Sequence, residues 1–154
     1  MTDNSTLTKI QLPVRPLTYV AGPYTGPTPG IQGERFRLLT VAACMLTHCK
    51  RWNVFSPITH SHPMHELGLG GDWEFWKKID TEYLSVSERI VIVTLDGWEK
   101  STGVNAETQI ARELGIPIYH MTAPCIGEQS NHYYSWLTDN NTGEFLQYAI
   151  TIKR

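Results

Sequence analysis

The chain has 154 residues, a formal net charge of −2 at pH 7 and 41% hydrophobic residues, which suits one domain large enough to bury a core. The weak negative charge and the lack of a basic run argue against a protein that coats nucleic acid. No segment reaches the roughly 18 apolar residues that a membrane span needs, and the first residues contain no apolar signal core. We therefore expect a cytoplasmic protein in which Cys44, Cys49 and Cys125 are reduced thiols.

The first third of the chain alternates short apolar runs with helical periodicity. Residues 1–16 are polar and contain prolines, which predicts a loose tail ahead of a single domain over residues 17–154. The run Leu17–Ala21 is followed by Gly-Pro and predicts a buried strand. Apolar residues at helical spacing predict a helix from about residue 32 to 50, and a second strand follows at residues 53–56.

The middle of the chain continues this alternation. Residues 56–72 are rich in histidine and glycine and are interpreted as a long loop, and a helix is predicted from about 72 to 87. The run RIVIVTL at 89–95 is rich in β-branched residues, as expected for a strand covered on both faces. A helix over Asn105–Leu114 and a strand over Ile116–Met121 follow. The pattern predicts an α/β fold with a doubly wound, mostly parallel sheet of the flavodoxin or Rossmann-like type.

The end of the chain has a different pattern. Residues 133–137 and 145–152 show the period of two that is typical of strands, with Leu146 and Tyr148 on one face. A turn-forming segment separates the two runs, which predicts a C-terminal β-hairpin. A helix beginning at Thr142, which would give a strand–helix ending, is the alternative.

Three carboxylates fall at the joints of the predicted elements. Asp80 lies in a helix, Asp96 ends the most apolar strand, and Glu107 lies near the start of the next helix. Ligands of open parallel sheets bind outside the carboxyl ends of the strands, where Asp96 and Glu107 are expected. Between them, Ser101 and Gly103 offer a hydroxyl and backbone N–H groups to a phosphate. Each of these residues also has an ordinary structural explanation, as a helix cap, a turn residue or an exposed carboxylate.

Further candidates lie near the same predicted edge. Gly22 and Tyr24 follow the first strand, where a glycine permits close approach of a ligand and an aromatic ring can stack on it. Trp98 is a second candidate for stacking on a planar ligand. No acidic residue ends the second strand to hold a ribose, so a dinucleotide site is not expected.

Three histidines, His60, His62 and His65, form the pattern H-x-H-x-x-H. Imidazoles at such spacing can bind zinc, but a proline lies between the second and third, and no regular scaffold is predicted there. We therefore expect no metal and no cofactor. Contact of His60 with a substrate is the preferred interpretation, and solvated loop histidines are the alternative.

With these residues identified, the chain resembles the nucleoside 2-deoxyribosyltransferase superfamily, including the 2'-deoxynucleoside 5'-monophosphate N-glycosidases. The resemblance extends from about residue 17 to 121. It rests on the sequence YVAG that begins at Tyr19, on Asp80, and on the motif S-x-G-x-x-x-E that ends at Glu107.

The resemblance implies a role for each matching residue. Glu107 corresponds to the nucleophile, Tyr19 to the tyrosine that orients it, and Asp80 to the aspartate that handles the proton of the leaving base. Ser101 and Gly103 match positions that hold a 5'-phosphate. The resemblance also implies a homodimer or larger homo-oligomer in which a neighbouring chain completes the pocket.

These roles require particular protonation states. A nucleophile must be ionised, which the helix N-terminus and the Tyr19 hydroxyl are expected to favour for Glu107. A general acid must keep its proton near neutral pH, so Asp80 should be desolvated by nearby tryptophans. The chain departs from the family in the DGWEK insertion that begins at Asp96 and in its histidine-rich segment. The position of Asp96 is closer to that of an aspartate in the transferase branch.

Four functions remain compatible with the sequence. The first is hydrolysis of the base–sugar bond of a nucleoside 5'-monophosphate, with deoxyribose as the expected sugar, and the second is transfer of the sugar to another base. A non-catalytic nucleotide sensor is the third, although the presence of Tyr19, Asp80 and Glu107 together argues against it. A metallohydrolase that uses the histidines is the fourth. In the first three cases the partner is a small nucleotide or nucleoside, with no polymeric nucleic acid and no membrane.

Overall fold

The structure is a computed structural model that describes residues 15–126, 132–140 and 142–152. Almost all of the predicted N-terminal tail therefore lies outside the described residues. Within them, no helix is long and apolar enough to cross a membrane.

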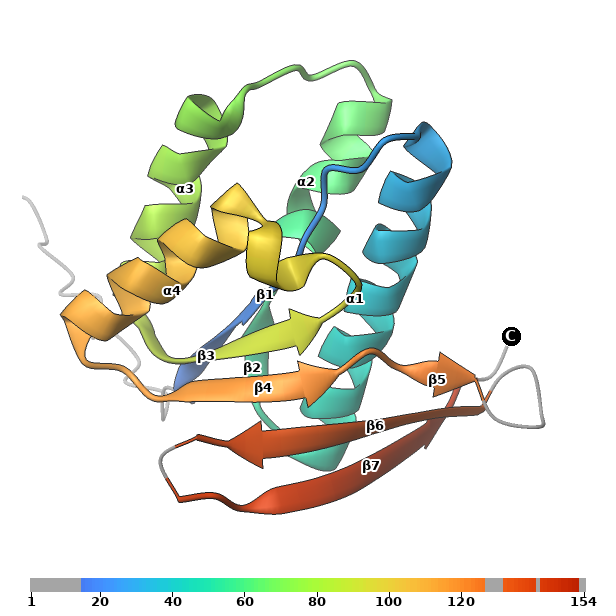
Figure 1. The fold of residues 1–154 in the computed structure, drawn as a ribbon, viewed down its shortest axis with the longest axis vertical. Coiled ribbons are helices and arrows are strands. Elements are labelled where there is room, and N and C mark those ends of the chain that lie inside the picture. Colours follow the sequence, from blue (N-terminus) through green and yellow to red (C-terminus); the bar gives the residue numbers. More distant parts are fainter. Residues whose placement is uncertain (1–14, 127–131, 141, 153–154) are drawn as a thin grey trace, which may run out of the picture.

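The described strands form one seven-stranded sheet in the order β2-β1-β3-β4-β6-β5, with β7 paired to β6 (Figure 1). The strands are β1 (Leu17–Ala21), β2 (Asn53–Phe55), β3 (Ser87–Thr94), β4 (Ile118–Thr122), β5 (Cys125–Ile126), β6 (His132–Asp139) and β7 (Phe145–Thr151). Strands β1 to β4 are parallel, and β6 runs antiparallel to β4, β5 and β7. The predicted mostly parallel sheet is confirmed.

Helices cover both faces of this sheet. They are α1 (Pro29–Cys49), α2 (Pro57–Glu66), α3 (Trp73–Ser85), the short 3-10 helix η1 (Trp98–Lys100) and α4 (Thr102–Leu114). Successive side chains of a strand point to opposite faces, so Val20 of β1 packs with Leu39 of α1, whereas Tyr19 packs with Leu84 of α3 and Val104 of α4. Helices on both faces of a parallel sheet make the fold the predicted doubly wound one.

The C-terminal hairpin is confirmed. Strands β6 and β7 pair antiparallel along their whole length, from His132 opposite Thr151 to Thr138 opposite Phe145. The alternative helix from Thr142 is wrong, because the apolar residues there alternate with the period of a strand. Buried Tyr133 and Leu137 of β6 pack into the cluster on the α1 side of the sheet.

The long loop predicted over residues 56–72 is wrong, because its first part folds as helix α2. The side chain of Ser56 caps this helix by accepting a hydrogen bond from Thr59 N, and Pro57 occupies the first helical position, where its missing N–H costs nothing. Pro63, the proline between His62 and His65, lies inside the helix. The true loop is the glycine-rich segment from Leu67 to Asp72 that leads into α3.

Candidate active site

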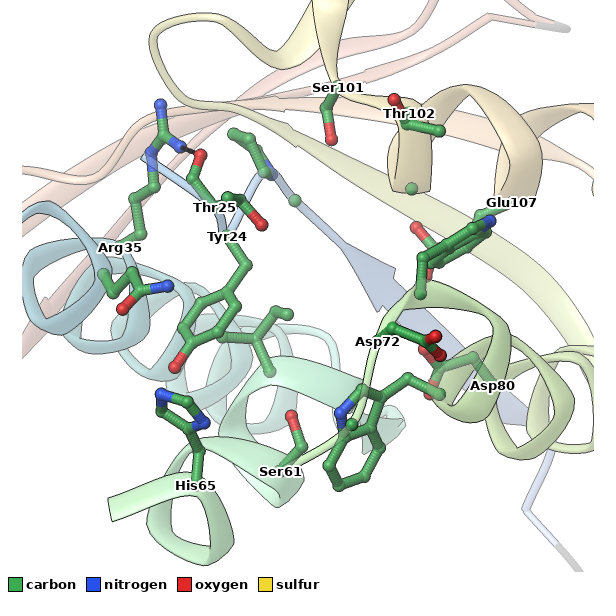
Figure 2. Close-up of a pocket in the computed structure, with 18 of the residues that line it drawn as sticks. Tyr24, Thr25, Arg35, Ser61, His65, Asp72, Asp80, Ser101, Thr102 and Glu107 are labelled. Carbon is green, nitrogen blue, oxygen red and sulfur yellow. Dashed lines mark hydrogen bonds between the residues drawn. The ribbon is translucent and has the colours of Figure 1, made fainter. Parts of the chain in front are cut away.

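A pocket of about 670 Å³ lies at the carboxyl ends of β1 and β3, where ligands of open parallel sheets bind. Its walls come from the segment after β1, from the start of α1, from α2, α3 and the start of α4 (Figure 2). The volume is within the range of roughly 300–1,000 Å³ that is usual for small-molecule sites. Among the predicted site residues, those that line it are Gly22, Tyr24, Asp80, Ser101, Gly103 and Glu107.

The Glu107 carboxyl is held at the base of this pocket by Tyr19. The Tyr19 hydroxyl donates a hydrogen bond of 2.6 Å to Glu107 Oε1. Tyr19 is fully buried, and Glu107 is only 6% exposed. Tyr19 belongs to β1 and Glu107 to α4, so the bond joins the sheet to a covering helix and fixes the direction of the carboxyl group.

The second carboxylate of the pocket is Asp80 of α3. Asp80 is partly buried, and desolvation raises the pKa of its carboxyl to about 6. Trp73 and Trp76 of the same helix line the pocket with it, and Figure 2 shows Asp80 and Glu107 on the same side of the cavity. Desolvation therefore raises the pKa of Asp80 in the expected direction, but a pKa of about 6 leaves most of its carboxyl ionised at pH 7.

The protonation of Glu107 differs from the expectation. Burial raises the pKa of Glu107 to about 8, the Tyr19 hydrogen bond lowers it, and the nearby charge of Asp80 raises it again. Helix α4 begins at Thr102, three residues before the predicted start, so Glu107 lies in the second turn. The helix dipole acts mainly on the first turn, and desolvation therefore outweighs the groups that favour the ionised form.

The start of α4 forms another wall of the pocket. Ser101 is the N-cap residue, and its side chain accepts a hydrogen bond of 3.4 Å from Val104 N. The first N–H groups of a helix have no acceptor within the helix, and Thr102 and Gly103, the first two residues of α4, line the pocket. Ser101 therefore has its expected structural role and also lies where an anion could bind.

Sequence reasoning missed two cationic residues of the pocket, Arg35 of α1 and Lys100 of η1. Arg35 donates hydrogen bonds to the carbonyl oxygens of Thr25 and Asp96, and so links the loops that follow β1 and β3. No carboxylate forms an ion pair with Arg35 or Lys100 within the described part of the chain. One signal was available for Arg35, because it lies in the second turn of the helix that follows the first strand.

Four predicted site residues are not among those that line the pocket: Tyr19 reaches the site only through its hydrogen bond to Glu107, and the other three lie elsewhere. Asp96 is exposed, and its backbone carbonyl rather than its carboxylate contacts Arg35. The Trp98 ring lies against the His120 ring, with centroids 5.1 Å apart. His60 is exposed, and its ring faces Phe55 and Tyr83. The register of η1 and α2 turns these side chains away from the cavity.

Gly22 lines the pocket, and its lack of a side chain also serves the packing of α1 on β1. A Cβ atom at this position would collide with the side chain of Leu39. The glycine therefore permits close packing of α1 on β1, and any larger residue would force the helix away from the pocket wall.

The three histidines of α2 have different environments. His62 is buried, stacks on Phe36 with ring centroids 4.2 Å apart, and forms a hydrogen bond of 2.7 Å between its Nδ1 and the Tyr24 hydroxyl. His65 lines the pocket, and His60 does not. The described residues contain no group of three or more His, Cys, Asp or Glu side chains that could hold a metal ion.

Comparison with known proteins gives a family but no activity. No curated protein matches the sequence. One family model matches residues 16–123, a span that contains strands β1 to β4 and every residue that lines the pocket. The match covers more than half of the chain, which therefore belongs to the family described as Domain of unknown function (DUF1937).

Proposed function

We propose that this protein is an N-glycosidase that cleaves the base–sugar bond of a nucleoside 5'-monophosphate, with Glu107 as the nucleophile. The observation that carries the proposal is the buried Tyr19–Glu107 hydrogen bond in a pocket that also contains Asp80. A structural carboxylate seldom remains buried without a cation, and the described residues give Glu107 none. A perturbed pKa in a cleft is instead typical of a catalytic group.

Two carboxyl groups suit the chemistry of an N-glycosidic bond. As that bond breaks, positive charge develops at the anomeric carbon, and a carboxylate can bond to it. In the proposed first step, Glu107 bonds to the anomeric carbon, the C–N bond breaks, and Asp80 gives its proton to the departing base. In the second step, Asp80 takes a proton from water while the water oxygen displaces Glu107.

The pKa values impose a condition on this cycle. The attacking form needs an ionised Glu107 and a protonated Asp80, but the pKa is about 8 for Glu107 and about 6 for Asp80. Glu107 therefore holds the shared proton in preference to Asp80, and the attacking form is the minor one of the two singly protonated forms of the pocket. The pH profile of kcat/KM should therefore be bell-shaped, with its acid and alkaline limbs both set by the coupled carboxyl pair.

The wall formed by the start of α4 supports a phosphorylated substrate. Thr102 and Gly103 offer N–H groups, Ser101 offers a hydroxyl, and Arg35 and Lys100 add positive charge that no carboxylate of the described residues neutralises. Charge-assisted hydrogen bonds of this kind are strong and favour a dianion over a neutral hydroxyl. The 5'-phosphate of the nucleotide is therefore proposed to bind here.

The transferase reaction would use the same first step, with a second base in place of water. The family that the motif around Glu107 resembles includes both hydrolases and transferases, and no observation in the pocket favours transfer. A cytoplasmic location and a homodimer also remain predictions. Sedimentation at micromolar concentration tests the dimer, and an active monomer would contradict it.

The proposal is tested by incubating the protein with 2'-deoxy and ribo nucleosides and their 5'-monophosphates, and by measuring free base and free sugar phosphate. The expected result is release of base from a monophosphate in the absence of any acceptor. Release that occurs only when a second base is added would identify a transferase. No release from any substrate, with binding intact, would leave a nucleotide sensor.

A further inference from the structure

The pocket wall away from the carboxylates contains a second group of polar side chains, which the proposed reaction does not use. Figure 2 shows Tyr24, Ser61 and His65 gathered on this side, apart from Glu107 and Asp80. Tyr24 comes from the loop after β1, and the other two come from α2. Behind this wall lies His62, which does not line the pocket but contacts Tyr24.

The environment of His62 determines which of its nitrogens carries the proton. Nε2 lies 3.5 Å from Oε1 of Glu66, one helical turn later. An ionised carboxylate can only accept a hydrogen bond, so it favours the tautomer with the proton on Nε2. In that tautomer Nδ1 is an acceptor, and we assign the 2.7 Å contact as a hydrogen bond that the Tyr24 hydroxyl donates.

This assignment fixes the hydrogen-bonding character of Tyr24 toward the pocket. A tyrosine hydroxyl has one hydrogen and can both donate and accept. When its hydrogen points to His62, only oxygen lone pairs remain for a ligand. The stacking of His62 on Phe36, with an interplanar angle of 21°, holds the imidazole in place, and the hydroxyl cannot turn its hydrogen toward the pocket without losing this bond.

We infer that Tyr24 is a specificity-determining residue that accepts a hydrogen bond from an exocyclic amino group of the base, and that His62 is the positioning residue that prevents Tyr24 from donating. This inference rests on the proposed function. A base with an amino group can donate to Tyr24, whereas a base with an oxo group at the same position would place two acceptors face to face. An unpaired or repelled polar group in a binding site costs a large factor in selectivity.

The inference is tested with matched pairs of 2'-deoxynucleoside 5'-monophosphates, adenine against hypoxanthine and cytosine against uracil. In the parent protein, kcat/KM should favour the amino member of at least one pair by about tenfold or more. Tyr24→Phe removes the acceptor and should reduce this preference to less than about threefold. His62→Phe keeps an aromatic ring on Phe36 but frees the Tyr24 hydroxyl to donate, so it should raise kcat/KM for the oxo member.

The rise for the oxo substrate separates a positioning role from a structural one, because damage to the fold would lower the rates for both members together. Tyr83→Phe serves as the matched control, since the Tyr83 ring stacks on Phe55 and does not line the pocket, so the parent preference should persist. If His62→Phe does not fold, Tyr24→Phe alone decides, by its loss of the preference.

The outcomes distinguish this inference from the proposed function. The inference is overturned, and the proposed function left intact, if the parent is active but shows no preference for the amino substrate. The same holds if the Tyr24→Phe and His62→Phe variants keep the parent's ratio of kcat/KM for the amino and oxo substrates. A parent that releases no base from any monophosphate would overturn both.

Discussion

Removal of the Tyr19 hydroxyl is the sharpest perturbation of the proposed active site. Tyr19→Phe keeps the ring that packs under α3 and α4 and deletes only the donor to Glu107, at 2.6 Å. A hydrogen bond to a charged group contributes about 1.5–3 kcal/mol. Since about 1.4 kcal/mol corresponds to one pKa unit, its loss should raise the pKa of Glu107 from about 8 to about 9 to 10.

The consequence for the rate follows from the protonation states. A higher pKa makes the ionised nucleophile rarer, so kcat/KM at pH 7 should fall by about 10- to 100-fold. The alkaline limb of the pH profile reports loss of the last proton from the carboxyl pair, and it should move from about pH 8 to about pH 9 to 10. The acid limb, near the pKa of about 6 of Asp80, should stay in place.

The assay is the initial rate of base release across pH 5 to about 10.5, within the stable range of each variant. Tyr83→Phe is the matched control, because the Tyr83 ring stacks on Phe55 and its hydroxyl makes no hydrogen bond to any residue that the structure describes. A Tyr19→Phe variant with the parent profile would refute the reasoning. A lower rate with an unmoved alkaline limb would show that Tyr19 only supports packing.

Three further predictions concern the same pocket. The native state favours protonated Glu107, because the pKa of about 8 lies above the ordinary value of 4.5. The contribution of Glu107 to stability is therefore present at low pH and is lost as pH rises from 4.5 to about 8. Glu107→Gln should be more stable than the parent above pH 8, by on the order of a few kcal/mol, and equal melting profiles at about pH 9 would contradict this. Ser101→Ala should raise KM for a monophosphate more than for the matching nucleoside, with about 1 kcal/mol lost from the helix cap; equal effects on both substrates would leave Ser101 as a cap alone. Exhaustive chelation should leave the rate unchanged, and loss of activity that zinc restores would favour a metallohydrolase.

Most of the fold was predictable because its signals are local. The run RIVIVTL needs no tertiary information to be recognised as a buried strand, and the alternation in the C-terminal segment was sufficient to predict the hairpin. Helix α2 was missed because residues 56–72 were interpreted as one long loop, although Ser56 as a cap and Pro57 at the first helical position were local signals for its start. Pro63 removes one intrahelical hydrogen bond, because it has no N–H to donate to the carbonyl of Thr59 four residues earlier.

Site residues that belong to a sequence motif, such as Glu107, could be predicted from their position along the chain. The direction of a side chain, into the pocket or away from it, could not be predicted in the same way. Asp96 and Trp98 occupy the expected loop, but the turn at Gly97, with a φ of 81°, and the 3-10 helix direct them away from the pocket. Arg35 was not identified, because helical periodicity marks the apolar face of a helix and not the polar side chains that reach a pocket; its place in the second turn after the first strand was the available signal. The high pKa of Glu107 depends on burial, which no local pattern reports.

The most direct test of the central claim is the release of free base from a nucleoside 5'-monophosphate by the parent protein and by Glu107→Gln. The substitution removes the nucleophilic charge and nearly preserves the shape of the side chain. We expect measurable release of base by the parent. In Glu107→Gln the rate of release should fall by several orders of magnitude, while the variant keeps a cooperative melting transition at neutral pH. Turnover by Glu107→Gln within about tenfold of the parent would contradict the assignment of Glu107 as the nucleophile.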